Sequence, residues 1–150
     1  MREVRRKIVE LLMRGFCAPS IQRIAKELGV PASTVHYNIK KMEEEGIIKT
    51  YKAVFDYSKI DMGFCAYVLI RLSPEEYNNP ERIASELAKY PQIESVDIIT
   101  GDWEIIIKVR VKDQDEYYEF VKKVLSRPGI VRIKSLISLK QLKTEFIKNF

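Results

Sequence analysis

Residues Ser20–Glu45 read SIQRIAKELGVPASTVHYNIKKMEEE and are followed by Gly46, and this stretch decides the fold of the N-terminal part of the chain. Its apolar spacing predicts a short amphipathic helix, a tight turn at 29–31 and a second amphipathic helix. Gly29 can adopt the positive φ that a sharp turn after a helix requires. Two helices joined at this spacing are typical of a helix-turn-helix, whose second helix enters the major groove of DNA.

The second of these helices, expected from about Ala32 to Glu45, has two chemically different sides. A narrow apolar stripe is expected to face the other helices and consists of Val35, Ile39 and Met42. The opposite side has hydroxyl groups near the helix start, where they suit base edges, and lysines further along, where they suit phosphates. The predicted DNA-binding residues are Ser33, Thr34, His36, Tyr37, Lys40 and Lys41. A plain solvated face is the alternative, but the preceding helix and glycine turn favour DNA.

The segments on either side complete a three-helix head. Apolar residues at helical spacing predict a first helix from about Arg2 to Arg14, and Ser20 is a candidate N-cap for the next. The carboxylates at 43–45 count against DNA binding, because they repel phosphate. After Gly46, alternating β-branched and aromatic residues predict a strand over Ile47–Phe55, and a loop is expected over 56–63.

Charge and cysteine content limit the classes of function. The whole net charge of +5 lies in residues 1–60, with 12 basic and 7 acidic residues, whereas residues 61–150 hold 14 of each. A basic head beside a neutral body is typical of a DNA-binding module on a body that does not bind DNA.

Cys17 and Cys65 lack metal-ligand spacing, so neither a metal nor another cofactor is expected. No apolar run approaches the roughly 18 residues that a membrane helix needs. No secretory leader is evident at the N-terminus, so we expect a cytoplasmic protein without a membrane partner.

The body, residues 64–142, shows the order strand, helix, strand, strand, helix, strand. The strands are expected over 65–72, 95–99, 103–111 and 130–139, with a short turn at Gly101-Asp102. One helix follows Asn79-Pro80, and the other follows a capping box formed by Asp113 and Glu116. This βαββαβ order is the ferredoxin-like arrangement.

Two helices cover only one face of such a sheet. The other face is too apolar to leave in water, with Tyr67, Leu69, Ile99 and Ile106. We therefore expect a second subunit on this face, and a two-fold dimer would place two recognition helices on palindromic double-stranded DNA.

The predicted fold class is α+β, with a helix-turn-helix (winged-helix-like) head and a ferredoxin-like domain. The expected domains are a DNA-binding head at 1–50, a β linker at 51–63, a dimerisation and effector-binding domain at 64–142, and a tail at 143–150.

The chain resembles the Lrp/AsnC, or feast/famine, family of transcription regulators from about Val4 to Leu142. The resemblance rests on the head IAKELGVPASTVHYNIKKMEEEGIIKTYKAVFD and the hairpin TGDWEIIIKVRV. It implies a homodimer through the C-terminal domains, often assembled into octamers, and binding to pseudo-palindromic promoter DNA. It also implies an amino-acid effector near the hairpin residues Thr100, Gly101, Asp102, Trp103 and Glu104.

Three departures from the family pattern bear on these expectations. The usual Leu-Asp-x-x-Asp opening is replaced by a segment with Arg5-Arg6. Pro31-Ala32 stands where a serine cap and a proline are usual, which weakens the cap. Glu104 replaces the usual aspartate of the hairpin, which puts the identity of the effector in question.

Two other functions remain open from the sequence. One is a sensor or assembly protein with a vestigial head. The other is an enzyme like the haem-pathway decarboxylases of the same two-domain plan, which act on tetrapyrroles. The sole histidine, His36, lies on the recognition helix, and no paired-carboxylate or Cys-His group is evident, so we do not expect an enzyme.

Overall fold

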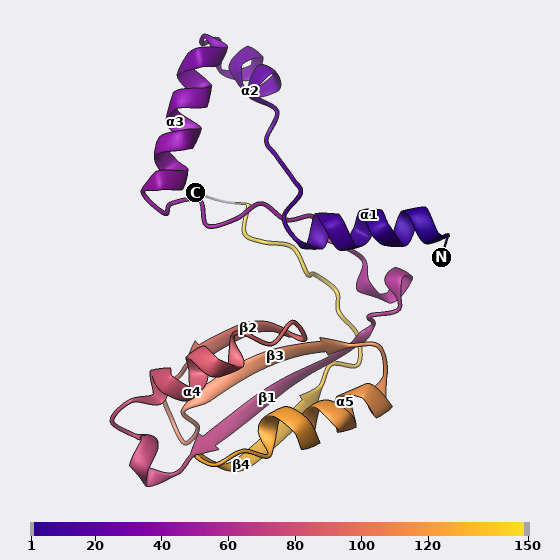
Figure 1. Ribbon diagram of the computed structural model, residues 1–150, viewed down its shortest axis with the longest axis vertical. Coiled ribbons are helices and arrows are strands. Elements are labelled where there is room, and N and C mark those ends of the chain that lie inside the picture. The colour runs from indigo at the N-terminus through magenta and orange to yellow at the C-terminus, as the bar shows by residue number, and fades with distance from the viewer. Residues whose placement is uncertain (1, 149–150) are drawn as a thin grey trace. The chain divides into compact units, whose positions relative to one another are not determined.

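The computed structural model describes residues 2–148. Its contacts divide the chain into two units, Met1–Phe55 and Asp56–Phe150. The first unit is helical and the second is built on a four-stranded sheet, so the predicted α+β class is confirmed (Figure 1). Among the described residues, no helix is long and apolar enough to span a membrane.

The first unit has the three predicted helices, α1 (Glu3–Met13), α2 (Ile21–Leu28) and α3 (Ala32–Glu44). The Ser20 hydroxyl accepts a hydrogen bond from the Arg23 amide at 3.3 Å, which confirms the predicted cap of α2. Gly29 ends α2 with φ of 65°, as the tight turn requires. Pro31 caps α3 without a side-chain hydrogen bond, so this helix start has the weak cap expected from the sequence.

Packing in the first unit is between α2 and α3, where Ala25 and Val35 are buried. In contrast, α1 has no buried residue. Three of its apolar residues are exposed, namely Val4 at 68%, Ile8 at 50% and Leu11 at 40%. The apolar stripe of α3 therefore meets α2, and the expected closure of a three-helix core by α1 is not seen.

The segment between the head and the sheet differs from its prediction. No strand forms over Ile47–Phe55, so the predicted β linker is wrong. A strand needs a neighbour to bond its backbone, and within residues 2–148 no strand pairs with these residues. Instead of a plain loop, a 3₁₀ turn η1 (Tyr57–Ile60) follows, and the Asp56 carboxylate accepts from the Ser58 amide at 3.2 Å. The Ser58 hydroxyl also donates to this carboxylate and is the main cause of its lowered pKa.

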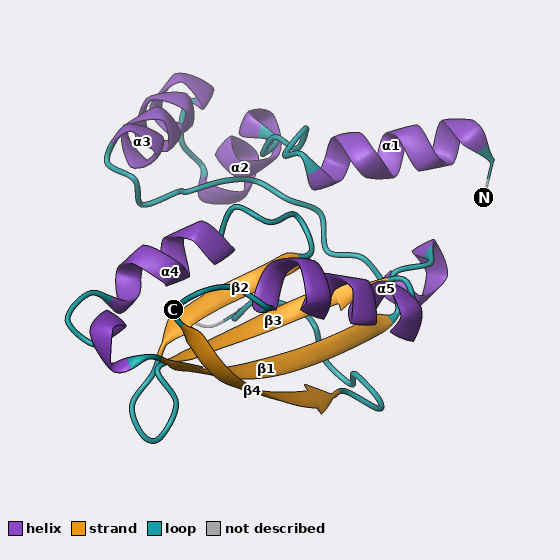
Figure 2. Ribbon diagram, turned by 60° about the horizontal axis from the view of Figure 1, so that its bottom comes forward, coloured by secondary structure: helices purple, strands orange, loops and turns teal. Residues whose placement is uncertain are grey.

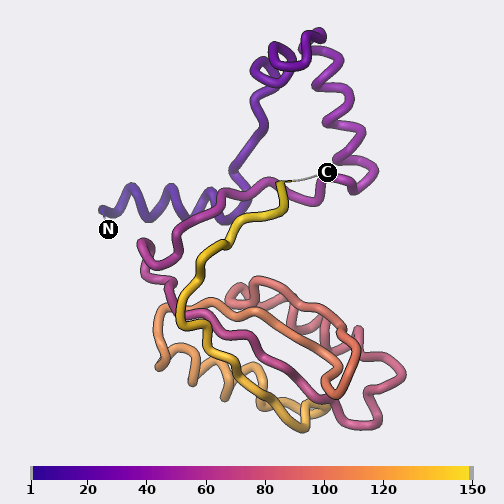
Figure 3. Tube along the Cα trace, turned by 180° about the vertical axis from the view of Figure 1, so that it is seen from behind, coloured from indigo at the N-terminus to yellow at the C-terminus, as the bar shows by residue number. Residues whose placement is uncertain are grey.

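The second unit has the predicted order of strands and helices. A four-stranded antiparallel sheet contains β1 (Phe64–Leu72), β2 (Ile93–Ile98), β3 (Ile105–Val111) and β4 (Ile130–Ile137). The strand order is β2-β3-β1-β4, and Figure 3 shows β1 running between β3 and β4. Between strands lie a 3₁₀ turn η2 (Pro74–Glu76), α4 (Pro80–Leu87) and α5 (Gln114–Phe120), which continues as a π-helical turn, η3 (Val121–Leu125). The ferredoxin-like arrangement is therefore confirmed.

Helices α4 and α5 cover the same face of the sheet (Figure 2). The strand residues that face these helices have no exposed surface; they are Ala66, Val68, Ile70, Leu72, Ile105, Ile107, Val109 and Val111. Their helix partners include Ile83, Leu87, Tyr117 and Phe120. Asp113 accepts from the Glu116 amide at 2.9 Å, and the Glu116 carboxylate accepts from the Lys112 amide at 2.7 Å, which fastens the start of α5.

The two cysteines have different surroundings. Cys65, on β1, is fully buried, and burial raises the pKa of its thiol. Cys17, in the segment between α1 and α2, is half-buried, and its thiol lies 3.8 Å from the Leu12 carbonyl oxygen, to which it donates. Neither forms a disulfide.

Candidate DNA interface and effector hairpin

The outward side of α3 is where helical phase predicts it. All six predicted DNA-binding residues are exposed, and Tyr37 has 61% of its surface in solvent. On the opposite side, Val35 is buried and Met42 is half-buried. Hydroxyl groups, an imidazole, a phenol and two ammonium groups thus stand on one side of a helix, free to approach a duplex.

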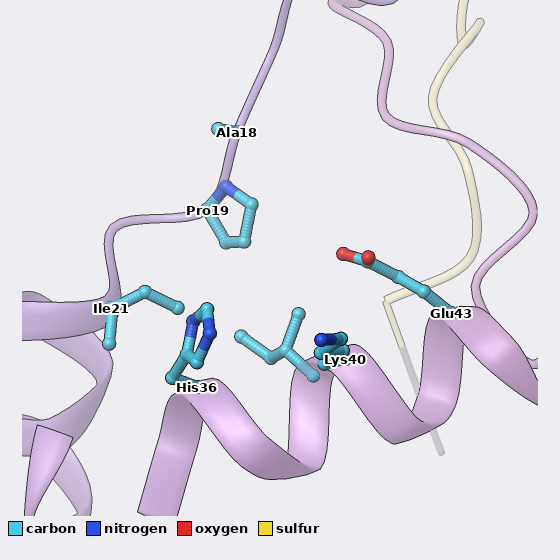
Figure 4. A pocket seen from close by; sticks show the side chains of 7 residues that line it. Ala18, Pro19, Ile21, His36, Lys40 and Glu43 are labelled. Carbon is cyan, nitrogen blue, oxygen red and sulfur yellow. The ribbon is translucent and has the colours of Figure 1, made fainter. Parts of the chain in front are cut away.

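One edge of this side borders an open hollow of about 330 Å³ within the head. His36, Lys40 and Glu43 line the hollow from α3, Ala18 and Pro19 line it from the segment that leads into α2, and Ile21 lines it from the first turn of α2 (Figure 4). His36 and Lys40 therefore lie at the edge of the side predicted to bind DNA, whereas Ser33, Thr34, Tyr37 and Lys41 do not line the hollow.

The acidic end of α3 has a structural role that the sequence did not suggest. The Tyr51 hydroxyl donates to the Glu43 carboxylate at 2.8 Å and so connects the helix end to the chain leaving the head. Loss of solvent and the nearby carboxylate raise the pKa of this phenol. Of the three glutamates that count against DNA binding, Glu43 is thus engaged within the head.

The effector hairpin is longer than predicted. The third strand begins at Ile105 rather than Trp103, so the connection is a loop that Ile99 and Glu104 close by a hydrogen bond of 3.0 Å. Thr100, Gly101 and Asp102 are exposed at its tip, and Gly101 has φ of 105°. Trp103 and Glu104 are half-buried where the loop meets the sheet.

The Glu104 side chain is bonded to β1 rather than free in solvent. Its carboxylate accepts from the Leu72 amide at 2.7 Å, and its own amide donates to the Ile70 carbonyl at 3.1 Å. Both contacts hold the loop against the end of β1. The side chain that the resemblance offers to an effector is thus already bonded within the domain.

Sequence reasoning missed Arg71, which holds the same loop from β1. Its guanidinium donates to the Asp102 carbonyl oxygen at 2.9 Å and 3.1 Å and lies 5.2 Å from the centre of the Trp103 ring. Arg132, opposite Arg71 on β4, lies 5.8 Å from the same ring. Its place in the strand alternation puts Arg71 on the face away from the helices, but only the register shows which loop it reaches.

That face has an apolar centre with charged surroundings. Tyr67 pairs with Leu136 across β1 and β4, and Leu69 pairs with Ile106 across β1 and β3. Tyr67 is 38% and Leu136 is 43% exposed, and Leu69 and Ile106 are half-buried. Ile99 lies just beyond the end of β2 and is also half-buried. No helix of the sheet domain covers this centre.

Comparison with known proteins gives two matches that together span nearly the whole chain. Residues 1–49 match a winged helix-turn-helix DNA-binding family, and residues 65–147 match the Lrp/AsnC ligand binding domain. The chain belongs to the Lrp/AsnC family. It is a transcriptional regulator, with a helix-turn-helix that binds DNA and a domain that binds a ligand.

Curated relatives of this Lrp/AsnC protein include regulators from Pyrococcus species. An uncharacterized HTH-type transcriptional regulator of Pyrococcus furiosus is 35% identical over 127 residues, which are 84% of this chain and 85% of the relative. The HTH-type transcriptional regulator FL11 of Pyrococcus horikoshii is 33% identical over 138 residues, which are 92% and 89% of the two chains.

Solved structures of the family share its fold. An AsnC family regulator from Agrobacterium tumefaciens has a TM-score of 0.73 at 23% identity, covering 100% of this chain and 96% of that one. A feast or famine regulatory protein from M. tuberculosis, complexed with L-methionine, also has a TM-score of 0.73, at 19% identity, covering 94% and 92%. Among the described residues of this Lrp/AsnC member, no cluster of three or more His, Cys, Asp or Glu side chains could hold a metal ion.

Proposed function

We propose that this regulator binds pseudo-palindromic promoter DNA as a homodimer or larger assembly and responds to an amino acid. The observation that carries the DNA part is the outward side of α3, where all six polar or aromatic side chains predicted to bind DNA are exposed. Short hydroxyls at a helix start suit base edges, and Lys40 and Lys41 suit the phosphates beside the groove.

The dimer is supported by the uncovered face of the sheet. Tyr67, Leu69, Ile106 and Leu136 form an apolar centre that two helices on the opposite face leave open. A second copy applied to this face would remove these side chains from water, which stabilises the pair by the usual hydrophobic term. A two-fold pair of sheets also carries two heads, as a palindromic site requires.

The effector part rests on the loop at 99–104. A family neighbour was solved with L-methionine, and the tip residues of this loop are exposed in this chain. Backbone amides at a glycine turn suit a carboxylate. Because Glu104 is bonded to Leu72, we infer that the exposed Asp102 carboxylate receives the effector's ammonium group.

Selection of bound duplexes from a random DNA pool at moderate salt tests the DNA proposal. Enrichment of a palindrome with half-sites about one helical turn apart is expected. Weak binding without enrichment, driven by low salt alone, would contradict sequence-specific regulation by the free protein.

Calorimetric titration with L-methionine and other amino acids tests the effector proposal. We expect saturable binding that Asp102→Asn weakens strongly and that a matched change at the exposed Asp115, on α5, leaves unchanged. Binding unaffected by Asp102→Asn would remove Asp102 from the effector site.

The comparisons favour a regulator over the enzyme considered from sequence, since the relatives are named transcriptional regulators. We propose that the chain has no catalytic role and acts in the cytoplasm, where a regulator meets chromosomal DNA.

A further inference from the structure

Arg110 is a buried charged residue of the sheet domain. It lies on β3, opposite Cys65 of β1, and its exposure is 4%. It alternates with the inward-facing Val109 and Val111, so its side chain belongs to the face away from α4 and α5. A guanidinium on that face would ordinarily be solvated, which raises the question of what covers it.

Two segments from opposite ends of the domain meet at this guanidinium. The Tyr57 ring, from the turn η1, stacks on it with 4.0 Å between the guanidinium carbon and the ring centre. Gln141, from the segment after β4, accepts a hydrogen bond from Nη2 at 2.9 Å. The same nitrogen lies 3.3 Å from the carboxylate of Glu94 on β2.

The two covering segments are also bonded locally. The Met62 amide donates to the Tyr57 carbonyl at 3.0 Å, and the Lys59 amide donates to the Asp56 carbonyl at 3.0 Å, so η1 is a closed turn. After β4, the Ser138 amide donates to the Cys65 carbonyl at 2.9 Å, which leads the chain across the end of β1 toward Gln141. η1 begins two residues after Phe55, the last residue of the DNA-binding unit.

An arginine suits this position because its planar group can stack and donate at the same time. A lysine would keep the charge but would have no flat face to stack on the Tyr57 ring. Arg110 is not optimised for stability alone, since its buried Nε has no hydrogen-bond partner among the described residues. A buried donor left in this way has a cost, which suggests that the group is retained for what it holds in place.

We propose that Arg110 is a positioning residue that fixes the exit of the DNA-binding head by clamping Tyr57 and Gln141 against the sheet. The clamp sets where the linker leaves the domain, and hence the geometry with which paired heads meet two half-sites. This second consequence rests on the proposed binding of palindromic DNA by a dimer, whereas the clamp itself does not.

Hydrogen exchange of the full-length protein tests the clamp directly. In Arg110→Met, the amides of Lys59, Met62 and Ser138 should exchange faster by about tenfold or more, because a desolvated stacking contact is lost. Arg110→Lys should give an intermediate increase. The control is Arg132→Met, which removes another arginine near an aromatic ring of the same sheet and should leave these three amides unchanged.

Tyr57→Leu removes the other partner of the stacking contact and keeps Arg110. This variant therefore tests the clamp if Arg110→Met does not fold. Faster exchange at Lys59, Met62 and Ser138 in either variant, with core amides of β1 and β3 unchanged, supports the clamp. Unchanged exchange at all three amides in a folded variant overturns it.

Binding to operators with altered half-site spacing tests the consequence for DNA. The wild type should prefer one spacing sharply, and Arg110→Met should bind a single half-site equally well but discriminate spacings by about tenfold less. Equal discrimination by both proteins would overturn the link from clamp to head geometry. If neither protein bound any DNA, the proposed function would fail, and the exchange experiment would still decide the clamp.

Discussion

Glu104 illustrates how one carboxylate can replace a backbone partner at the end of a strand. The Leu72 amide lies at the last residue of β1, where the neighbouring strand has already become loop, and the Glu104 side chain supplies its acceptor. A buried amide without an acceptor is costly, so this contact contributes to stability as well as to loop geometry.

Glu104→Ala should therefore lower the free energy of unfolding by about 1–3 kcal/mol, because the Leu72 amide loses its acceptor. Urea titration measures the loss. Asp102→Ala is the matched control, since Arg71 bonds the Asp102 backbone carbonyl, which this change retains, and it should be nearly neutral. A fully stable Glu104→Ala protein would show that the hydrogen bond is dispensable.

Lys40 is the residue whose proposed role is easiest to separate from folding, because it is exposed. Lys40→Ala should weaken binding at all DNA sequences and reduce the slope of log affinity against log salt by about one contact. Filter binding or fluorescence anisotropy over a salt series measures both. Lys89→Ala, an exposed lysine of the sheet domain, is the control. Unchanged affinity and slope would remove Lys40 from the interface.

At the scale of elements, the sequence predicts structure correctly where the contacts that decide it join residues close together in the chain. The outward side of α3 follows from the phase of one helix, and the caps at Ser20 and Asp113 need partners only three residues away. The strands of the sheet domain alternate, so their buried positions could be assigned before their neighbours were known.

The errors arose where a distant partner decides the outcome. Ile47–Phe55 has the composition of a strand, but the described part of the chain supplies no strand to pair with it. The hairpin was predicted too short because Glu104 bonds Ile70 and Leu72 of β1, which the local pattern does not reveal. The roles of Arg71 and Arg110 likewise depend on sheet register, so the sequence alone could not assign them.

Ser20 provides a test of one element alone. Ser20→Ala should destabilise α2 by about 1 kcal/mol, because the Arg23 amide loses its acceptor at the helix start. Ser20→Asp, which keeps an acceptor, should retain most of the stability. Thermal unfolding followed by circular dichroism measures both variants. Equal stability of the alanine and aspartate proteins would contradict a capping role.

At the scale of the whole molecule, a basic helical unit is joined to a neutral sheet unit that leaves one sheet face partly apolar. The proposed DNA contacts lie in one unit and the proposed dimer contacts lie in the other. Substitutions in one unit should therefore leave the property that depends on the other unit unchanged. Mutations on the uncovered face should alter the oligomeric state without altering how one head contacts one half-site.

Leu69→Lys places a second cation beside Lys134 at the centre of that face. We expect the dimer dissociation constant to rise about 30-fold or more, as for a central interface residue worth about 2 kcal/mol. Sedimentation equilibrium measures it. Tyr118→Lys changes an exposed aromatic residue of α5 instead and should have no effect. A Leu69→Lys protein that stays fully dimeric would place the interface elsewhere.

The burial of Cys65 leaves the half-buried Cys17 as the more accessible thiol in a chain with two cysteines. A maleimide dye should therefore attach to the DNA-binding unit at a single position without any engineered cysteine. In a dimer, two such dyes would report the separation of the heads by energy transfer. The natural protein thus carries an attachment site for a dye pair whose energy transfer could be compared before and after DNA or an amino acid is added.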